Sequence, residues 1–143
     1  MNRPVNRREF VATCAGVGAT VLLGGCVALV THPVPVQGER VRLSINAFPE
    51  LAREYGAIKI LPDAFDDPIY VLSVGAGFAA LSPICTHRGC TVDVHGQRLV
   101  CPCHGSTYDR DGRVLRGPAQ RALTRFPVTR DGDDLVIELG ARA

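Results

Sequence analysis

The sequence predicts an all-β fold, and its length, composition and turn residues support this prediction. The chain has 143 residues and a mass of 15.3 kDa, which suits one small domain with a modest core. Charged residues make up 21% and hydrophobic residues 46%, which excludes a disordered chain. The 15 glycines and 10 prolines are typical of a chain with many turns and argue against a long helical bundle.

Residues 1–30 predict an export signal or a membrane anchor. Positions 10–30 carry no charge, and as a helix they would extend about 31 Å at roughly 1.5 Å per residue, enough to cross a hydrocarbon core. The pair Arg7-Arg8 directly before this run resembles a twin-arginine (Tat) export signal. We therefore expect the rest of the chain to face the periplasm or the outer side of the cytoplasmic membrane.

Two cysteines lie in this apolar run. Residues 23–26 resemble a lipobox, so Cys26 is a candidate for lipidation after cleavage. The apolar residues that follow Cys26 instead favour a retained anchor helix, and both interpretations stay open, with release of the chain as a third. Cys14 is interpreted as a small apolar residue of the helix. Both leading interpretations tether the chain to a membrane.

Residues 31–39 predict a linker or hinge. They contain two prolines and a glycine and show no helical periodicity. His32 is interpreted as an exposed residue of this linker. The remainder, 40–143, is predicted to be the head.

The head is predicted to be an antiparallel β-sandwich with one insertion. Apolar residues alternate with polar ones from Val41 to Ile45, which predicts a strand. A short helical turn is predicted near 49–53. Two hairpins are predicted where apolar and β-branched runs flank short turns, at 69–74 with 78–81 and at 126–129 with 135–139.

The formal charge of +2 belongs to the N-terminal segment. Without the first 27 residues the chain has 13 basic and 13 acidic side chains. A neutral body is a poor partner for nucleic acid, so we expect no nucleic-acid binding.

The insertion, 83–119, holds four cysteines and three histidines. Residues 85–90 read Cys-Thr-His-Arg-Gly-Cys, and residues 101–106 read Cys-Pro-Cys-His-Gly-Ser. Thiolates and imidazoles together suit either zinc or an iron-sulfur cluster. The residues between the two segments predict a hairpin that folds the second segment back beside the first. His95 lies at its turn and is interpreted as exposed and structural.

Both segments resemble the two motifs of the Rieske [2Fe-2S] proteins, Cys-x-His-x-Gly-Cys and Cys-x-Cys-His-Gly-Ser. The resemblance covers about residues 40–139 and implies a Rieske-type sandwich with a small cluster-binding subdomain and one [2Fe-2S] cluster per subunit. It implies that two thiolates bind one iron and two imidazoles the other, the ligands being Cys85 with Cys101 and His87 with His104. Neutral imidazoles make the cluster less negative, which raises its reduction potential.

The resemblance also implies a disulfide between Cys90 and Cys103 that joins the two segments. The predicted export supplies the oxidising compartment that a disulfide requires. A structural zinc site with two cysteines and two histidines explains neither of these additional cysteines. The Gly-Ser-x-Tyr continuation at 105–108 likewise favours the cluster.

Three further residues resemble parts of a high-potential Rieske site. In that pattern the hydroxyl of Ser106 donates to a bridging sulfide, and the hydroxyl of Tyr108 donates to a cysteine sulfur. Donated hydrogen bonds favour the more negative reduced state and raise the potential. Residues 116–119 resemble the loop with which the family covers its cluster, with Pro118 in the covering position.

The predicted disulfide and export signal favour membrane-tethered heads that oxidise quinol, as in quinol-cytochrome c reductase of the cytochrome bc type. In that setting His87 and His104 lie at the tip, and His104 accepts a hydrogen bond from quinol. The partners implied are cytochrome b and a c-type cytochrome, and the chain is then an oxidoreductase subunit that is not catalytic alone.

Two features depart from that pattern. Arg88 stands where quinol-oxidising heads carry an apolar residue, and a charge there costs desolvation unless its partner differs. The connection between His87 and Cys101 is also shorter than in the large respiratory subunits. Two alternatives therefore remain: a small Rieske subunit of a molybdenum oxidoreductase such as arsenite oxidase, and a stand-alone tethered electron carrier.

Overall fold

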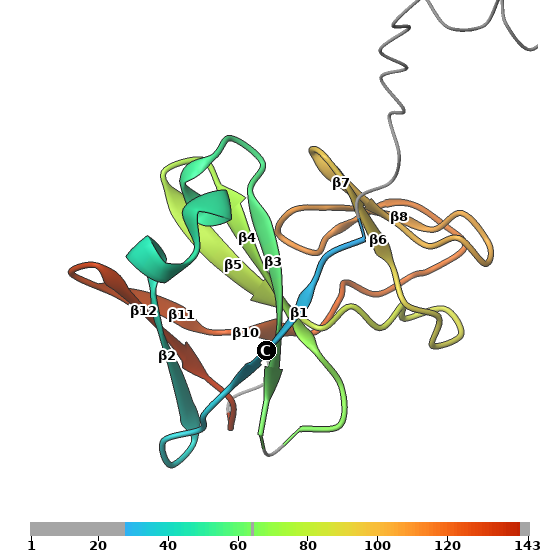
Figure 1. The fold of residues 1–143 in the computed structure, drawn as a ribbon. Helices are drawn as coiled ribbons and strands as arrows, with labels where there is room; N and C mark the ends of the chain where they lie inside the picture. The colour runs from blue at the N-terminus through green and yellow to red at the C-terminus, as the bar shows by residue number, and fades with distance from the viewer. Residues whose placement is uncertain (1–27, 64, 141–143) are drawn as a thin grey trace, which may run out of the picture.

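The computed structural model describes residues 28–63 and 65–140, and almost all regular structure in this range is β (Figure 1). The all-β prediction is confirmed. Cys14, Cys26 and nearly all of the predicted signal or anchor lie outside the described residues. Within the described residues, no helix has the length and apolar character needed to span a membrane.

Two sheets pack together to form the larger lobe, which we call the base (28–82 and 124–140). The first has the strand order β1 (Thr31–Val34), β3 (Ala57–Pro62), β4 (Ile69–Val74), β5 (Gly77–Leu81) and β10 (Arg125–Phe126). The second joins β11 (Val128–Asp131), β12 (Asp134–Glu138) and β2 (Arg40–Ser44). Their alternating apolar residues meet in one core that includes Val41, Leu43, Ile58, Ile60, Val71, Leu135 and Ile137.

The predicted local elements of the base are confirmed. β4 and β5 form the first hairpin, and β11 and β12 form the second. The predicted helical turn is a 3₁₀ helix, η2 (Pro49–Ala52), which follows a shorter one, η1 (Ile45–Ala47). The run predicted at 126–129 divides between the two sheets, because Phe126 pairs with Ala80 whereas Val128 pairs with Ile137.

The structure differs from the prediction at the start of the linker. Thr31–Val34 forms β1, which pairs in parallel with β3 at the edge of an otherwise antiparallel sheet. The buried side chain of Val34 joins the base core, and an edge strand tolerates Pro33. His32 is half-buried and meets the ring of Phe48 edge-on at 5.2 Å, so it is not a free linker residue.

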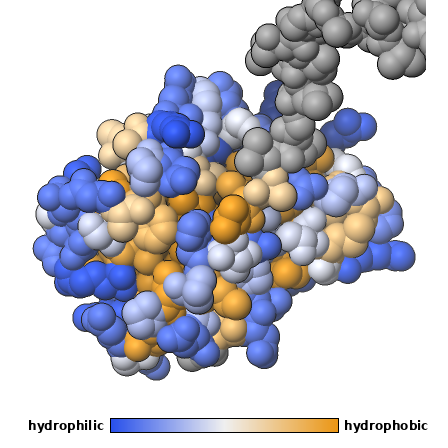
Figure 2. Space-filling model, in the orientation of Figure 1, coloured by the Kyte–Doolittle hydropathy of each residue, from blue (hydrophilic) through white to orange (hydrophobic). Residues whose placement is uncertain are grey.

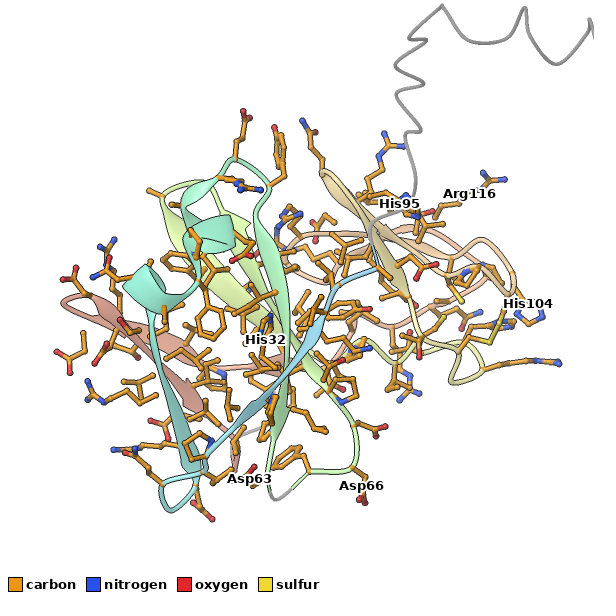
Figure 3. All side chains as sticks on the ribbon, viewed as in Figure 1. His32, Asp63, Asp66, His95, His104 and Arg116 are labelled. Carbon is orange, nitrogen blue, oxygen red and sulfur yellow. A yellow bond between two sulfur atoms is a disulfide. The ribbon has the colours of Figure 1, made fainter. Side chains whose placement is uncertain are left out.

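A second, smaller lobe is formed by the chain between β5 and β10 and extends from the base. We call residues 83–123 the cluster lobe. Its four-stranded sheet joins β6 (Asp93–His95), β7 (Arg98–Val100), β8 (Thr107–Asp109) and β9 (Val114–Arg116). The predicted hairpin is β6–β7, and His95 is exposed at its end (Figure 3). The core of this lobe includes Cys85, Cys101, Val92, Leu99 and Tyr108.

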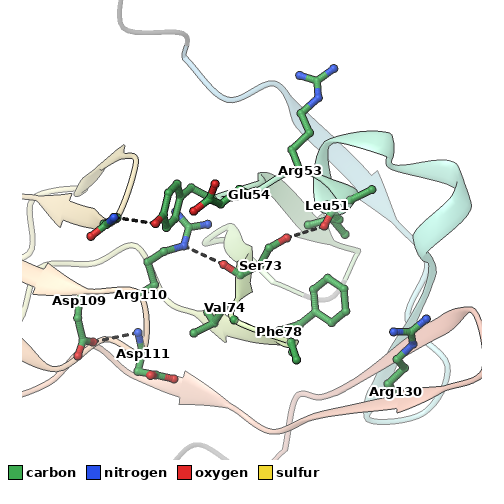
Figure 4. A pocket seen from close by; sticks show the side chains of 16 residues that line it. Leu51, Arg53, Glu54, Ser73, Val74, Phe78, Asp109, Arg110, Asp111 and Arg130 are labelled. Atoms are coloured by element: carbon green, nitrogen blue, oxygen red, sulfur yellow. Dashed lines mark hydrogen bonds between the residues drawn. The ribbon is translucent and has the colours of Figure 1, made fainter.

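Arg110 connects the two lobes. Its buried guanidinium donates to three backbone carbonyls, which belong to Gly56 at 2.5 Å and Ser73 at 3.0 Å in the base and to Gly96 in the cluster lobe. Figure 4 shows the bond to Ser73. Burial lowers the pKa of the guanidinium from its usual value. None of the ion pairs among the described residues includes Arg110. The dipoles of the three carbonyls, and not a carboxylate, therefore stabilise its positive charge.

The hollow beside Arg110 has a volume of about 640 Å³ and is shown in Figure 4. Side chains of both lobes line it, among them Tyr55, Gln97 and Asp111. It contains none of the cysteines or histidines of the two motifs. The candidate site must therefore be built from the loops of the cluster lobe.

Candidate metal centre

Two loops with the same backbone hydrogen bonds form the candidate centre. In the first, the N–H of Cys85 donates to the carbonyl of Cys90 at 2.8 Å, and the N–H of Gly89 donates to Cys85 at 2.9 Å. In the second, Cys101 donates to Ser106 at 2.8 Å, and Gly105 donates to Cys101 at 2.9 Å.

The glycine of each loop has a backbone conformation that other residues rarely adopt. φ is +79° at Gly89 and +75° at Gly105, both in the left-handed region. A glycine four residues after the first cysteine thus closes each loop around its cysteine and histidine. Both loops therefore have the same geometry, and each presents one thiol and one imidazole.

The loops bring two free thiols and two imidazoles together. Cys85 and Cys101 are both free and buried, with exposed fractions of 2% and 1%. The rings of His87 and His104 meet edge-on, with their centroids 4.8 Å apart. His87 is half-buried, whereas His104 is exposed at the end of the cluster lobe (Figure 3).

One atom of this group has no protein partner. Nδ1 of His87 is buried and, among the described residues, is the only such side-chain nitrogen or oxygen without a hydrogen bond. Buried polar atoms are normally satisfied, so the unpartnered Nδ1 of His87, two residues after the buried thiol of Cys85, fits a metal ligand.

The predicted disulfide between Cys90 and Cys103 is confirmed. It joins the two loops across a Cα–Cα distance of 6.5 Å. The sulfurs of Cys90, Cys101 and Cys103 lie within 4.8 Å of one another, but the disulfide removes two of them as thiolate ligands. The donors that remain are Cys85, Cys101, His87 and His104, which fit a [2Fe-2S] cluster with two thiolates and two imidazoles.

Hydrogen bonds prepare Cys85 to act as a thiolate. Burial disfavours its charged form, but hydrogen bonds from the hydroxyl of Tyr108, the backbone of His87 and the side chains of Cys101 and Ser106 outweigh it and lower the pKa of the thiol. The hydroxyl of Tyr108 lies 3.2 Å from Sγ of Cys85. A thiolate can only accept, so Tyr108 is the donor.

A family model for the Rieske [2Fe-2S] domain matches residues 54–127, which include both loops and the cluster lobe. The chain belongs to the Rieske [2Fe-2S] family. One [2Fe-2S] cluster per chain follows from this membership, and the donor set described above would hold it.

Relatives and solved structures agree with this membership. The chain is 43% identical to the cytochrome b6-f complex iron-sulfur subunit of Prochlorococcus marinus subsp. pastoris, over 94% of this chain and 85% of the relative. It is 29% identical to the subunit of the same name from Chlorobaculum tepidum, over 93% of this chain and 75% of the relative. It resembles the structure of the plasma membrane Rieske protein of Synechocystis PCC 6803, with a TM-score of 0.52, 32% identity, and coverage of 58% of this chain and 86% of that one.

Thr86 is a site residue that the sequence did not single out. Its N–H donates to the Tyr108 hydroxyl at 3.3 Å, and its own hydroxyl donates to the carbonyl of Arg121 at 2.6 Å. The oxygen of the Tyr108 hydroxyl therefore accepts a hydrogen bond from Thr86, while its hydrogen is donated to Sγ of Cys85. The position of Thr86 between Cys85 and His87 was the only available signal.

The loop after β9 meets the Rieske site through Ala119. The N–H of Ala119 donates to the Ser106 hydroxyl at 3.0 Å, which leaves the hydroxyl hydrogen of Ser106 directed to the Cys85 side of the site. Ser106 and Ala119 are buried, whereas Pro118 is exposed. Within the loop at 116–119, Ala119 is thus the residue that seals the inner side.

Replacing Tyr108 with phenylalanine is expected to lower the midpoint potential of the Rieske cluster by several tens of millivolts, on the order of 1 kcal/mol for one lost hydrogen bond. Phenylalanine keeps the buried ring and removes only the donor to Cys85. The potential is measured by redox titration of the visible spectrum, with iron content as the check on assembly. Tyr70→Phe is a matched control, because Tyr70 donates to the carbonyl of Val92 and not to a ligand. An unchanged potential in Tyr108→Phe would mean that Tyr108 serves only in packing.

Proposed function

We propose that this Rieske chain accepts electrons from quinol and passes them to a c-type cytochrome, as a membrane-tethered subunit of a cytochrome bc-type complex. The proposal places the head on the periplasmic or outer side of the cytoplasmic membrane. Its support is the set of relatives named cytochrome b6-f complex iron-sulfur subunit, together with the disulfide between the two loops.

The observation that carries the proposal is the difference in exposure between the donors. The thiols of Cys85 and Cys101 are buried, whereas His104 is exposed at the end of the cluster lobe. A redox partner therefore reaches the centre through the imidazole side. An exposed imidazole can also form a hydrogen bond to a hydroxyl of quinol, which neither buried thiol can do.

Each residue of the site has a separate role in the proposed electron transfer. When bound, the cluster supplies a one-electron acceptor whose potential the two imidazoles raise. His104 presents its outer nitrogen to the quinol hydroxyl, and His87 lies against it. Tyr108 and Ser106 direct hydrogen bonds toward the buried side, and Ala119 seals that side from water.

The structure of β1 changes where a hinge belongs. Because Thr31–Val34 pairs along β3, this segment moves with the base. Leu29 packs against the core of the cluster lobe as well, so residues 29–34 do not act as the hinge on which the proposed head would swing.

The test is to purify the full chain from its native membrane in mild detergent and to analyse its companions. We expect b-type and c-type haem in stoichiometric amounts with the iron of the Rieske chain. Co-purification of molybdenum would contradict the proposal in favour of a molybdenum oxidoreductase. Recovery of the chain alone, with no reduction of its cluster by quinol, would contradict it in favour of a stand-alone carrier.

A further inference from the structure

Charge is divided unequally between the two lobes. The cluster lobe has six arginines and only three acidic residues, whereas the described part of the base has six basic and ten acidic residues. A body that is neutral as a whole therefore has one basic and one acidic end. Figure 2 shows hydrophilic residues over much of the visible face and hydrophobic ones gathered toward its middle.

Three exposed arginines belong to, or are joined by the backbone to, the loops that carry the histidines. Arg88 directly follows His87 in the first loop. Arg116 pairs in the sheet with Thr107, just beyond the second loop, and lies on the same lobe as His104 in Figure 3. The backbone of Arg121 accepts a hydrogen bond from Thr86 in the first loop. We call Arg88, Arg116 and Arg121 the basic rim.

The basic rim is not neutralised by the described part of the chain. None of the ion pairs there includes Arg88, Arg116 or Arg121. Other arginines are paired: Arg42 contacts Asp131 and Asp134 at 3.0 and 2.9 Å, and Arg125 contacts Asp111 at 2.8 Å. The rim thus presents unpaired positive charge on and next to the loops of the site.

We infer that the basic rim docks the cluster lobe on the acidic surface of a redox protein partner. This inference rests on the proposed function insofar as electrons leave through His104. Complementary charge steers two proteins together and orients them before contact. The acidic base strengthens the orientation, because a negative partner surface attracts the cluster lobe and repels the other end. Arg88, which departs from the apolar residue of quinol-oxidising heads, then has a partner that compensates its desolvation.

Small oxidants of opposite charge test the rim directly. The reduced full-length holoprotein is mixed in a stopped-flow instrument with anionic hexacyanoferrate(III) or cationic tris(phenanthroline)cobalt(III), each taking one electron from it. We expect the rate constant to fall with added salt for the anion and to rise for the cation. The variant Arg88→Gln/Arg116→Gln/Arg121→Gln is expected to slow the anionic reaction at low salt on the order of tenfold.

A control variant of equal charge change separates the rim from net charge. Arg53→Gln/Lys59→Gln/Arg130→Gln removes three positive charges from the base and is expected to change the anionic rate less than about twofold. The midpoint potential of each variant is measured as well, so that a change in driving force is not mistaken for a change in docking. Equal effects of the two triple variants would overturn the inference.

Two c-type cytochromes, one acidic and one basic, extend the test to a protein partner. The acidic cytochrome is expected to oxidise the holoprotein on the order of tenfold faster at low salt, and this preference is expected to vanish in the rim variant. Equal rates with both cytochromes would overturn the inference. If oxidation were in addition slower with phosphatidylglycerol vesicles than with phosphatidylcholine vesicles, the rim would bind the lipid surface instead of a protein partner.

The two proposals fail in distinguishable ways. The inorganic oxidants require neither quinol nor a cytochrome complex, so an absent complex leaves their result unchanged. If the complex is recovered but the rim variant behaves as the wild type, only the inference about the rim fails.

Discussion

Replacing Arg110 with methionine is expected to lower the free energy of unfolding by about 4 kcal/mol. The guanidinium donates to the carbonyls of Ser73, Gly56 and Gly96, and methionine removes all three hydrogen bonds. The Gly56 carbonyl keeps the N–H of Ser73 as a donor, and water can reach the exposed Gly96, so the expected loss comes from the hydrogen bonds themselves. A hydrogen bond from a charged group contributes about 1.5–3 kcal/mol. Methionine fills much of the volume, so lost hydrogen bonds dominate the effect.

The measurement is urea denaturation followed by far-UV circular dichroism. Arg113→Met is the matched control, because the Arg113 side chain is 74% exposed and its contacts to Asp109 and Asp111 are both 3.9 Å long. We expect the control to change stability by less than about 0.5 kcal/mol. Equal stability of the two variants would show that the three hydrogen bonds of Arg110 contribute no net stability.

Removing the disulfide, in the variant Cys90→Ala/Cys103→Ala, is expected to lower the free energy of unfolding by about 3 kcal/mol. The bridge spans 13 residues, and closing a loop of this length reduces the entropy of the unfolded chain. Without it, the loops that carry His87 and His104 are joined mainly through the cluster. We therefore also expect the iron to be lost at a lower temperature.

Thermal release of iron and urea denaturation measure the two effects. Wild-type protein with the disulfide reduced by a phosphine is the control, and we expect it to behave like the double variant. If the double variant retained iron and unfolded as the oxidised wild type does, the disulfide would not be what holds the loops together.

Local patterns made much of the fold predictable. Both hairpins of the base follow from apolar alternation around short turns, which depends only on neighbouring residues. The strand β1 does not follow from such a pattern, because its partner is the edge of β3, more than 20 residues away. The passage of the chain from one sheet to the other at Pro127 was not predictable either. It depends on which edges of the two sheets are free to pair, and no local pattern contains that information.

The candidate site was predictable where chemistry is confined to a short motif. The two motifs drew attention to these cysteines and histidines, and the family resemblance implied both the ligands Cys85, His87, Cys101 and His104 and the disulfide. The hydrogen bonds of Thr86 and Ala119 were not predictable, because they depend on a loop that returns from residues 119–121. Arg110 has no motif around it, and its role emerges only when three distant carbonyls converge on it.

The most direct test of the account is metal and sulfide analysis of the purified full-length chain, combined with Mössbauer spectroscopy. The account predicts two irons and two inorganic sulfides per chain, with one iron site bound by thiolates and a distinct one bound by imidazoles. His87→Ser and His104→Ser would abolish the second site. Zinc in place of iron, or two irons with identical all-sulfur surroundings, would contradict it.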